Sequence, residues 1–160
     1  MTPIVQRALR QKYPPPTPEA EAFLAIQIAA ARLLDPWARY LKSSGVTPGQ
    51  YNVLRILRGA RPEALTCGEI AERMITRDPD ITRLLDRLDS RQLVTRERDA
   101  ADRRVIRTRI AGPGLDLLAA LDAPALEMGV RAMSALSPTK LKELTRLLST
   151  IITHAEGEIQ

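Results

Sequence analysis

The amino-acid sequence predicts a mostly α fold with a small β component, of the α+β kind. Apolar residues recur at helical spacings of three and four along most of the chain, behind repeated helix-start signals. Arginines alternate with β-branched and apolar residues between residues 93 and 110, where strands are expected. Hydrophobic residues make up 44% of the 160 residues but aromatics only 3%, so the core must be mainly Leu, Ile, Val and Ala. This length fits one domain, or one protomer whose ends pack against a partner.

Residues 1–17 are expected to form a flexible basic arm. They contain three cations and no carboxylate, and they end in the Pro14–Pro16 run, which favours an extended connector. The arm lacks the long apolar run of a signal peptide and the length of a membrane span. We therefore expect a cytoplasmic protein with no membrane partner.

A long helix is predicted from Pro18 to about Lys42. Thr17 followed by Pro18 is a typical helix start, and the apolar residues that follow mark one helical face. Pro36 is expected to kink or restart this helix, because proline removes a backbone hydrogen bond.

Two capping boxes predict the next two helices. Thr47 with Gln50 opens one helix, which ends at Gly59, and Thr66 with Glu69 opens another. In each box the threonine side chain and the residue three positions later satisfy backbone N–H groups that a helix start leaves free.

The following helix is expected to begin at Pro79, with Asp78 as its N-cap. Its apolar residues fall within one arc, and its polar residues lie on the opposite arc. The apolar arc holds Ile81, Leu84, Leu85 and Leu88, and the polar arc holds Pro79, Thr82, Arg83, Asp86, Arg87 and Ser90. One face can pack while the other enters a groove; the alternative is a solvated surface of ion pairs.

Two short β-prone runs, residues 93–98 and 103–110, flank a polar tip and predict a β-hairpin. Asp102, Arg103 and Arg104 place cations where a minor groove could accept them, and the aspartate could hold one guanidinium. The alternative is a solvated tip with internal ion pairs. Two capped helices followed by this hairpin predict a winged helix-turn-helix over residues 46–112, whose usual partner is double-stranded DNA. The net charge of +5 weakly favours a polyanionic partner.

Five residues around the hairpin carry a resemblance to a known family. Asp102, Arg104, Ile110, Ala111 and Gly114 follow the spacing D-x-R-x5-L-T-x-x-G, which resembles the wing signature of the multiple-antibiotic-resistance regulator (MarR) family. The resemblance extends from about residue 47 to residue 118. In three places the chain departs from the family pattern. Ile110 and Ala111 replace the usual Leu-Thr pair, Gln92 stands where a helix-ending glycine is common, and Asp78 and Asp80 bring negative charge that leaves the base preference open.

The resemblance implies a homodimeric transcriptional regulator, a repressor that binds a pseudo-palindromic operator with half-sites about 34 Å apart. It identifies ten residues as the candidate DNA-binding set. These are Arg77, Pro79, Asp80, Thr82, Arg83, Asp86, Arg87, Asp102, Arg103 and Arg104.

Residues 18–45 and 113–157 are expected to form the helical dimerisation region. One helix should run from Pro113 to about Ala135, interrupted near Pro124, and the last should start at Ser137 and Pro138. Their apolar faces exceed what a small winged domain can cover, so two copies are expected to interlock, as in the family. The alternative is that they fold back on their own chain.

A small aromatic or phenolic effector is a further implication of the resemblance. Trp37, Tyr40 and Tyr51 lie on the helices that would wall its pocket, although aromatics at this spacing also suit a plain core. Cys67 could be a redox sensor near a helix start, or simply a small, partly buried residue.

Catalysis is not expected. His154 is the only histidine, and the chain shows no Cys/His cluster with metal spacing, no glycine-rich phosphate loop and no nucleophile elbow. No cofactor or metal is therefore predicted. The remaining alternative is a dimeric winged-helix module that binds proteins and not DNA.

Overall fold

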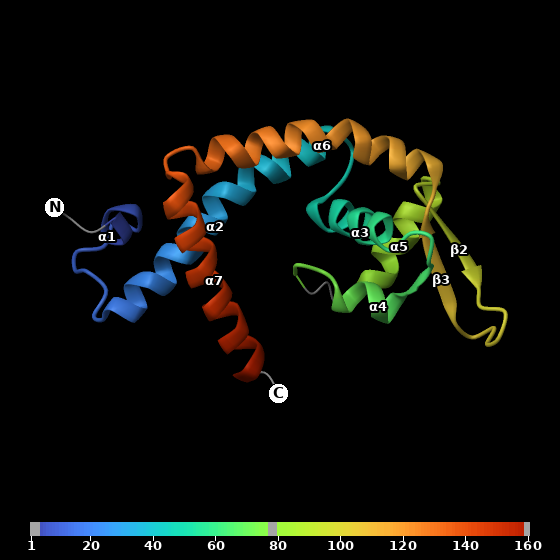
Figure 1. Cartoon of the computed structure of the whole chain (residues 1–160), viewed down its shortest axis with the longest axis horizontal. Coiled ribbons are helices and arrows are strands. Elements are labelled where there is room, and N and C mark those ends of the chain that lie inside the picture. The colour runs from blue at the N-terminus through green and yellow to red at the C-terminus, as the bar shows by residue number, and fades with distance from the viewer. Residues whose placement is uncertain (1–3, 77–79, 159–160) are drawn as a thin grey trace. The chain divides into compact units, whose positions relative to one another are not determined.

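The computed structural model describes residues 4–76 and 80–158 (Figure 1). The contacts divide the chain after Asp122 into two compact units, residues 1–122 and 123–160. The elements in chain order are α1 (Ile4–Ala8), α2 (Pro18–Ser43), α3 (Pro48–Gly59), β1 (Leu65–Thr66), α4 (Cys67–Glu72), α5 (Ile81–Ser90), β2 (Val94–Arg98), β3 (Ile106–Ile110), α6 (Gly112–Met133) and α7 (Pro138–Glu158). The predicted mostly α fold with a winged helix-turn-helix is confirmed.

The hairpin belongs to a three-stranded antiparallel sheet with the order β1-β3-β2. In β2 and β3, Val94 faces Ile110 and Arg98 faces Ile106, so the hairpin is in register along both strands. The sequence did not predict β1. It is only two residues long, and it adds Leu65 opposite Thr108 on the other edge of β3.

Both capping boxes form as predicted. The backbone N–H of Gln50 donates to Thr47 Oγ1 at 3.2 Å, and the N–H of Thr47 donates to Gln50 Oε1 at 2.9 Å. In the second box, the backbone N–H of Glu69 donates to Thr66 Oγ1 at 3.2 Å, and the N–H of Thr66 donates to Glu69 Oε2 at 2.7 Å. These local bonds fix where α3 and α4 begin.

Helix α5 begins at Ile81, so the predicted start at Pro79 was wrong. Asp80 takes the N-cap position but makes no side-chain cap hydrogen bond, and its carboxylate lies 3.3 Å from the Nε of Arg83. Asp78 and Pro79, predicted as N-cap and first helical residue, lie outside the described residues, as does Arg77.

The prolines within the long helices do not break them. Helix α2 continues through Pro36 without the predicted restart, and α6 continues through Pro124, where an interruption was predicted. Each proline removes one hydrogen bond and the rest of the helical ladder remains. Pro36 is also exposed, where water can solvate a freed carbonyl.

The N-terminal segment contains a short helix before its prolines. Ile4–Ala8 forms α1, which packs against α2 with Val5 fully buried. Pro14–Pro16 has no regular secondary structure. The prolines therefore connect α1 to α2.

One hydrophobic core supports the winged domain. Leu54 and Leu57 of α3, Ile70 of α4, and Leu85 and Leu88 of α5 are almost completely buried within it. Burial of the α5 leucines leaves the polar arc of that helix on the surface. Outside the core, Arg58 of α3 donates two hydrogen bonds to Asp122 of α6, at 2.7 and 3.1 Å.

Two backbone positions explain the fit between α5, the hairpin and α6. Gln92, which stands where the family commonly has a helix-ending glycine, adopts a φ of 57°, a left-handed conformation that strains a residue with a side chain. At Gly114, a Cβ atom would lie 2.2 Å from the carbonyl oxygen of Leu93, so a side chain there would collide with the backbone. The Gly114 of the wing signature is therefore a packing requirement.

In the part of the chain that the structure describes, no helix combines the length and apolarity that a membrane crossing demands.

Candidate nucleic-acid interface

The polar arc of α5 is the first element of the candidate interface. Thr82, Arg83, Asp86 and Arg87 are exposed, whereas the leucines on the opposite side pack into the core. The ion pair between Arg83 and Asp80 leaves 76% of the Arg83 side chain and 51% of the Asp80 side chain exposed. An exposed pair contributes little to stability, so Arg83 can exchange this partner for a nucleic acid at small cost.

Asp86 differs from the other residues on this arc. Its carboxylate accepts a short hydrogen bond from Nη1 of Arg96, which lies on β2. The side chain of Arg96 is only 17% exposed. Asp86 therefore connects α5 to the hairpin.

The hairpin tip holds Arg104 as the sequence predicted. Arg104 donates from Nε and Nη2 to the two carboxylate oxygens of Asp102, at 3.1 and 3.0 Å, and its backbone N–H donates to Oδ1 at 3.0 Å. This bidentate pair lowers the pKa of the Asp102 carboxyl and raises the pKa of the Arg104 guanidinium. The Arg104 side chain is still 90% exposed, so it is oriented and accessible at once.

Asp99 organises the turn that presents this pair. The side chain of Arg107 donates to its carboxylate, and so do the backbone N–H groups of Ala101 and Asp102, at 2.8 and 3.3 Å. These hydrogen bonds, the one from Arg107 first, lower the pKa of the Asp99 carboxyl. Arg107 also donates to the carbonyl of Ala64 at 3.3 Å, which ties the tip to the segment before β1.

Sequence reasoning missed Asp99, Arg96 and Arg107. A signal for Asp99 was present, since aspartate at the first position of a turn commonly accepts from N–H groups two and three residues on. The two arginines gave no such signal, because their partners depend on how α5 and the strands pack.

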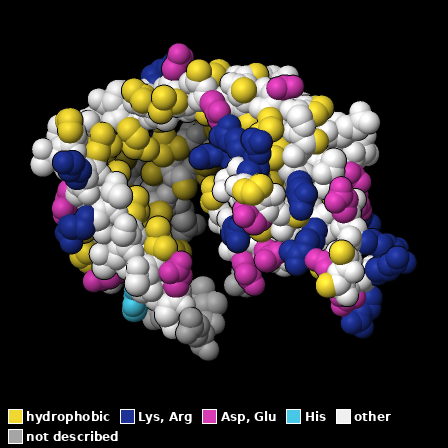
Figure 2. Space-filling view, turned by 45° about the vertical axis from the view of Figure 1, so that its right-hand side comes forward, with side chains coloured by type: hydrophobic (Ala, Val, Ile, Leu, Met, Phe, Trp, Pro, Cys, Tyr) yellow, Lys and Arg dark blue, Asp and Glu magenta, His cyan; other side chains and the backbone are white. Residues whose placement is uncertain are grey.

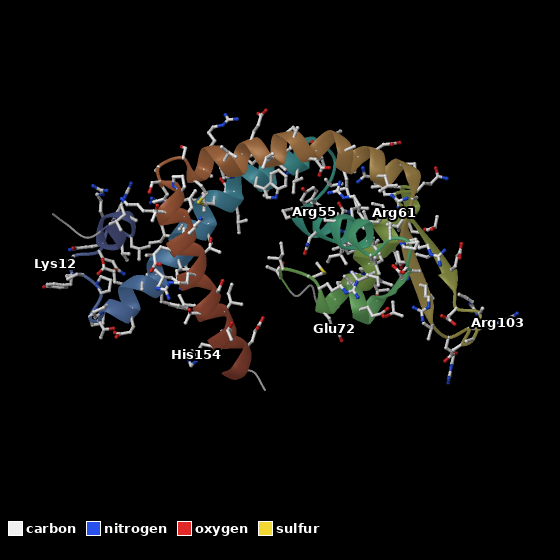
Figure 3. All side chains as sticks on the ribbon, viewed as in Figure 1. Lys12, Arg55, Arg61, Glu72, Arg103 and His154 are labelled. Carbon is white, nitrogen blue, oxygen red and sulfur yellow. The ribbon has the colours of Figure 1, made fainter. Side chains whose placement is uncertain are left out.

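Four further arginines project from α5 and the hairpin with no ion pair among the described residues. They are Arg87, Arg98, Arg103 and Arg109. Arg103 lies at the far end of the hairpin (Figure 3), and dark blue side chains stand out at this end of the winged domain in Figure 2. This concentration of unpaired cations suits a polyanionic partner.

The sequence and the fold of this chain both match known winged helix-turn-helix proteins. Residues 44–105 match the profile of the MarR family. Over 87% of this chain and 99% of the other, the sequence is 34% identical to a crystallised MarR transcription factor from Planctomyces limnophilus, with a TM-score of 0.66. The chain belongs to the MarR family.

Two further relatives illustrate what MarR-like proteins do. The chain is 32% identical over 91 residues to the HTH-type transcriptional repressor MdtR of Bacillus subtilis (strain 168), and this match spans 57% of each protein. The structure of an S. aureus MepR–DNA complex has the same fold, with a TM-score of 0.74 at 22% identity, over 81% of this chain and 95% of that one.

The aromatic residues that the MarR resemblance singled out lie together. Trp37 stacks on Tyr40 with ring centroids 5.7 Å apart, and the Trp37 and Tyr51 rings form a T-shaped pair with centroids 5.1 Å apart. Arg55, labelled in Figure 3, lies 5.8 Å from the centre of the Tyr51 ring. Trp37 and Tyr40 are partly buried against the core, so the cluster serves packing, and an effector pocket at these residues stays a prediction.

Cys67 and His154 belong neither to α5 nor to the hairpin. Cys67 is a partly buried free thiol at the start of α4, and His154 lies on α7. Among the described residues, no group of three or more His, Cys, Asp or Glu side chains is placed to hold a metal ion.

Proposed function

We propose that this protein is a homodimeric DNA-binding transcriptional regulator that acts as a repressor at a pseudo-palindromic operator. The observation that carries the proposal is the pairing of two features on one domain. Helix α5 exposes a polar arc above buried leucines, and the hairpin beside it presents Arg104, already oriented by Asp102. MdtR is a transcriptional repressor, which supports the proposed repressor role of this chain, and the MepR–DNA complex supports the proposed DNA binding.

In the proposed complex, α5 enters the major groove and the hairpin reaches the adjacent minor groove. Thr82 and Arg83 lie in the first turn of α5 and meet base edges before Arg87 does. Arg104 enters the minor groove, and Arg103 lies beside it. Arg77, Pro79 and Asp80 belong to the same proposed surface at the start of α5, where Arg77 and Pro79 are assigned from sequence alone.

Homodimerisation is proposed through residues 18–45 and 113–157. Helix α2 exposes Phe23 at 66% and Leu34 at 59%, and α7 exposes Ile151 at 49% and Ile152 at 56%. Apolar surface of this kind on two long helices favours an interface with a second copy. Two winged domains would then address half-sites about one helical turn apart, near 34 Å.

The regulatory signal is proposed to be a small aromatic or phenolic molecule that binds near Trp37, Tyr40 and Tyr51. The support for this part is the clustering of the three rings at the junction of α2 and α3. A ligand that favours one orientation of the winged domains would shift the dimer away from its DNA-binding spacing.

The experiment that tests the proposal is selection of genomic fragments by the purified protein, followed by sequencing. Selected duplexes are then compared with shuffled duplexes of equal length and composition by fluorescence anisotropy. We expect tighter binding to the selected duplex and a footprint with two half-sites about one helical turn apart. Equal binding to both duplexes would contradict an operator-specific regulator, and absence of binding would favour the protein-interaction module.

A further inference from the structure

Asp86 and Arg96 form an ion pair that joins the two elements proposed to contact DNA. Asp86 lies in the second turn of α5, and Arg96 lies at the centre of β2, opposite Thr108 of β3. The Nη1 of Arg96 donates to Oδ1 of Asp86. The pair therefore joins α5, the proposed recognition helix, to the hairpin.

The pair is asymmetric in its exposure. The Asp86 side chain is 56% exposed, but that of Arg96 is only 17% exposed, and the Nε of Arg96 is buried with no hydrogen-bond partner among the described residues. A largely buried guanidinium needs a counter-charge, because removing one partner leaves an uncompensated charge away from water. Asp86 supplies that charge.

The other ion pairs of the hairpin do not reach α5. Asp102 pairs with Arg104 within the tip, and Asp99 pairs with Arg107 at the base of the tip. Arg107 extends towards α4, where Glu69 lies 3.9 Å away. Among the ion pairs of the described residues, Asp86–Arg96 is the one that bridges α5 and the hairpin.

A second contact fixes the far end of the recognition helix. Arg91, which follows α5, donates to the carbonyl oxygen of Gly45 in the turn between α2 and α3. In addition to its buried leucines, α5 is thus held by a hydrogen bond from Arg91 at its end and by the ion pair with Arg96 at its middle.

We propose that Asp86 is a positioning residue whose ion pair with Arg96 holds the recognition helix and the hairpin in the relative orientation that lets both reach one duplex. This inference rests on the proposed DNA-binding function. It assigns Asp86 a role different from the direct DNA contact expected from its place on the polar arc. A carboxylate already neutralised by Arg96 also adds less repulsion to a phosphate backbone than a free one.

The test is a double-mutant cycle of Asp86→Asn, Arg96→Gln and the combined variant, with Asp89→Asn as the matched control. Asp89 is an exposed aspartate on the same helix without an ion pair among the described residues, so its substitution makes the same charge change. We expect each single variant of the pair to weaken operator binding about tenfold, within the range of couplings between contacting residues. The combined variant should be no weaker than the weaker single variant, and Asp89→Asn should bind as the parent does.

Two readouts separate positioning from base contact. The loss in Asp86→Asn should be shared by Arg96→Gln, with no change in base preference at any operator position. In the DNA-free protein, NMR residual dipolar couplings of the β2 and β3 amides relative to those of α5 should change in both variants and not in Asp89→Asn. A changed base preference in Asp86→Asn alone, or dipolar couplings equal to those of the parent, would overturn the proposal.

The dipolar couplings also separate the positioning role of Asp86 from the proposed DNA-binding function, because they are measured without DNA. If the parent binds no duplex, the proposed function fails whatever the couplings show. If Asp86→Asn does not fold, the exchanged pair, Asp86→Arg with Arg96→Asp, takes its place. Recovery of the parental couplings by that variant supports the ion pair, and failure of the folded variant to recover them overturns it.

Discussion

Asp102 and Arg104 form an exposed ion pair whose value lies in orientation more than in stability. Surface pairs typically contribute less than about 1 kcal/mol to folding, and Arg104 keeps 90% of its side-chain surface in solvent. The bidentate geometry restricts the rotamers of a long side chain before DNA arrives, so less entropy is lost on binding. The pair is therefore suited to a DNA contact.

Arg104→Ala should weaken operator binding severely and leave the melting temperature almost unchanged. The reason is that a narrow minor groove concentrates negative potential that the arginine would otherwise meet. Asp102→Ala should weaken binding less, because it frees the arginine without removing it. Anisotropy titrations and thermal melts of both variants measure these effects. Parental affinity in Arg104→Ala, or a larger loss in Asp102→Ala, would show that Arg104 is not the minor-groove contact.

Arg83→Ala should cost about 1 to 3 kcal/mol of operator binding and relax the preference at one position per half-site, as expected for a bidentate base contact. The exposed position of Arg83 in the first turn of α5 favours such a contact. Competition titrations with single-base operator variants provide the measurement. An equal loss on operator and random duplex would instead identify Arg83 as a phosphate contact.

At the scale of elements, the helix starts that depend on local bonds could be predicted and the long-range contacts could not. Thr47 and Thr66 cap their helices with residues three positions away, so the sequence contains the whole signal. The start of α5 was misplaced because the Asp-Pro signal at residues 78 and 79 predicted a start at Pro79, whereas Asp80 takes the N-cap position without a side-chain cap hydrogen bond. Strand β1 was missed because two residues carry no periodicity, and its existence depends on the register with β3.

In the candidate site too, contacts between residues close in sequence could be predicted and a long-range contact could not. The polar arc of α5 and the Asp102–Arg104 pair involve residues close in sequence, and both could be predicted. The partner of Arg96 lies ten residues away on a different element, so the pair with Asp86 required the packed structure. Spacing alone placed Asp86 on the polar arc of α5 and could not show that its carboxylate pairs with Arg96.

Gly114→Ala should destabilise the winged domain by about 1 to 3 kcal/mol, the usual cost of overpacking. The added Cβ would meet the Leu93 carbonyl at 2.2 Å, and backbone atoms cannot move aside as a flexible side chain can. Urea denaturation at fixed protein concentration measures the change. Gly112→Ala is the matched control, because a Cβ there meets nothing within 4 Å. Equal stability of the two variants would contradict the close approach.

At the scale of the whole molecule, the exposed apolar residues of α2 and α7 are the feature that the chain alone does not account for. Phe23 and Ile152 are both more than half exposed. Exposure of several large apolar side chains to water on long helices is unfavourable for a monomer. A partner copy that covers them would make folding and assembly interdependent.

Deleting residues 141–160 should therefore give aggregated or unfolded protein. The deletion removes most of α7 and, in the proposed dimer, exposes the apolar surface that α7 covers. Size-exclusion chromatography with light scattering and circular dichroism would measure the outcome. A soluble, well-folded monomer after the deletion would refute the proposed assembly.

As a smaller change, Ile151→Asp should shift the dimer towards monomer, whereas Ser149→Asp, on the same helix, should not.

The salt dependence of duplex binding tests the central claim most directly. Each phosphate neutralised by an arginine releases counterions, so the logarithm of the binding constant should fall linearly with the logarithm of the salt concentration. The slope is expected to be about −0.9 for each phosphate contacted, and therefore to equal several units for an interface that includes α5 and the hairpin. We predict this steep line for the parent protein. Undetectable binding at low salt, or affinity that does not change with salt, would contradict a winged domain that binds DNA.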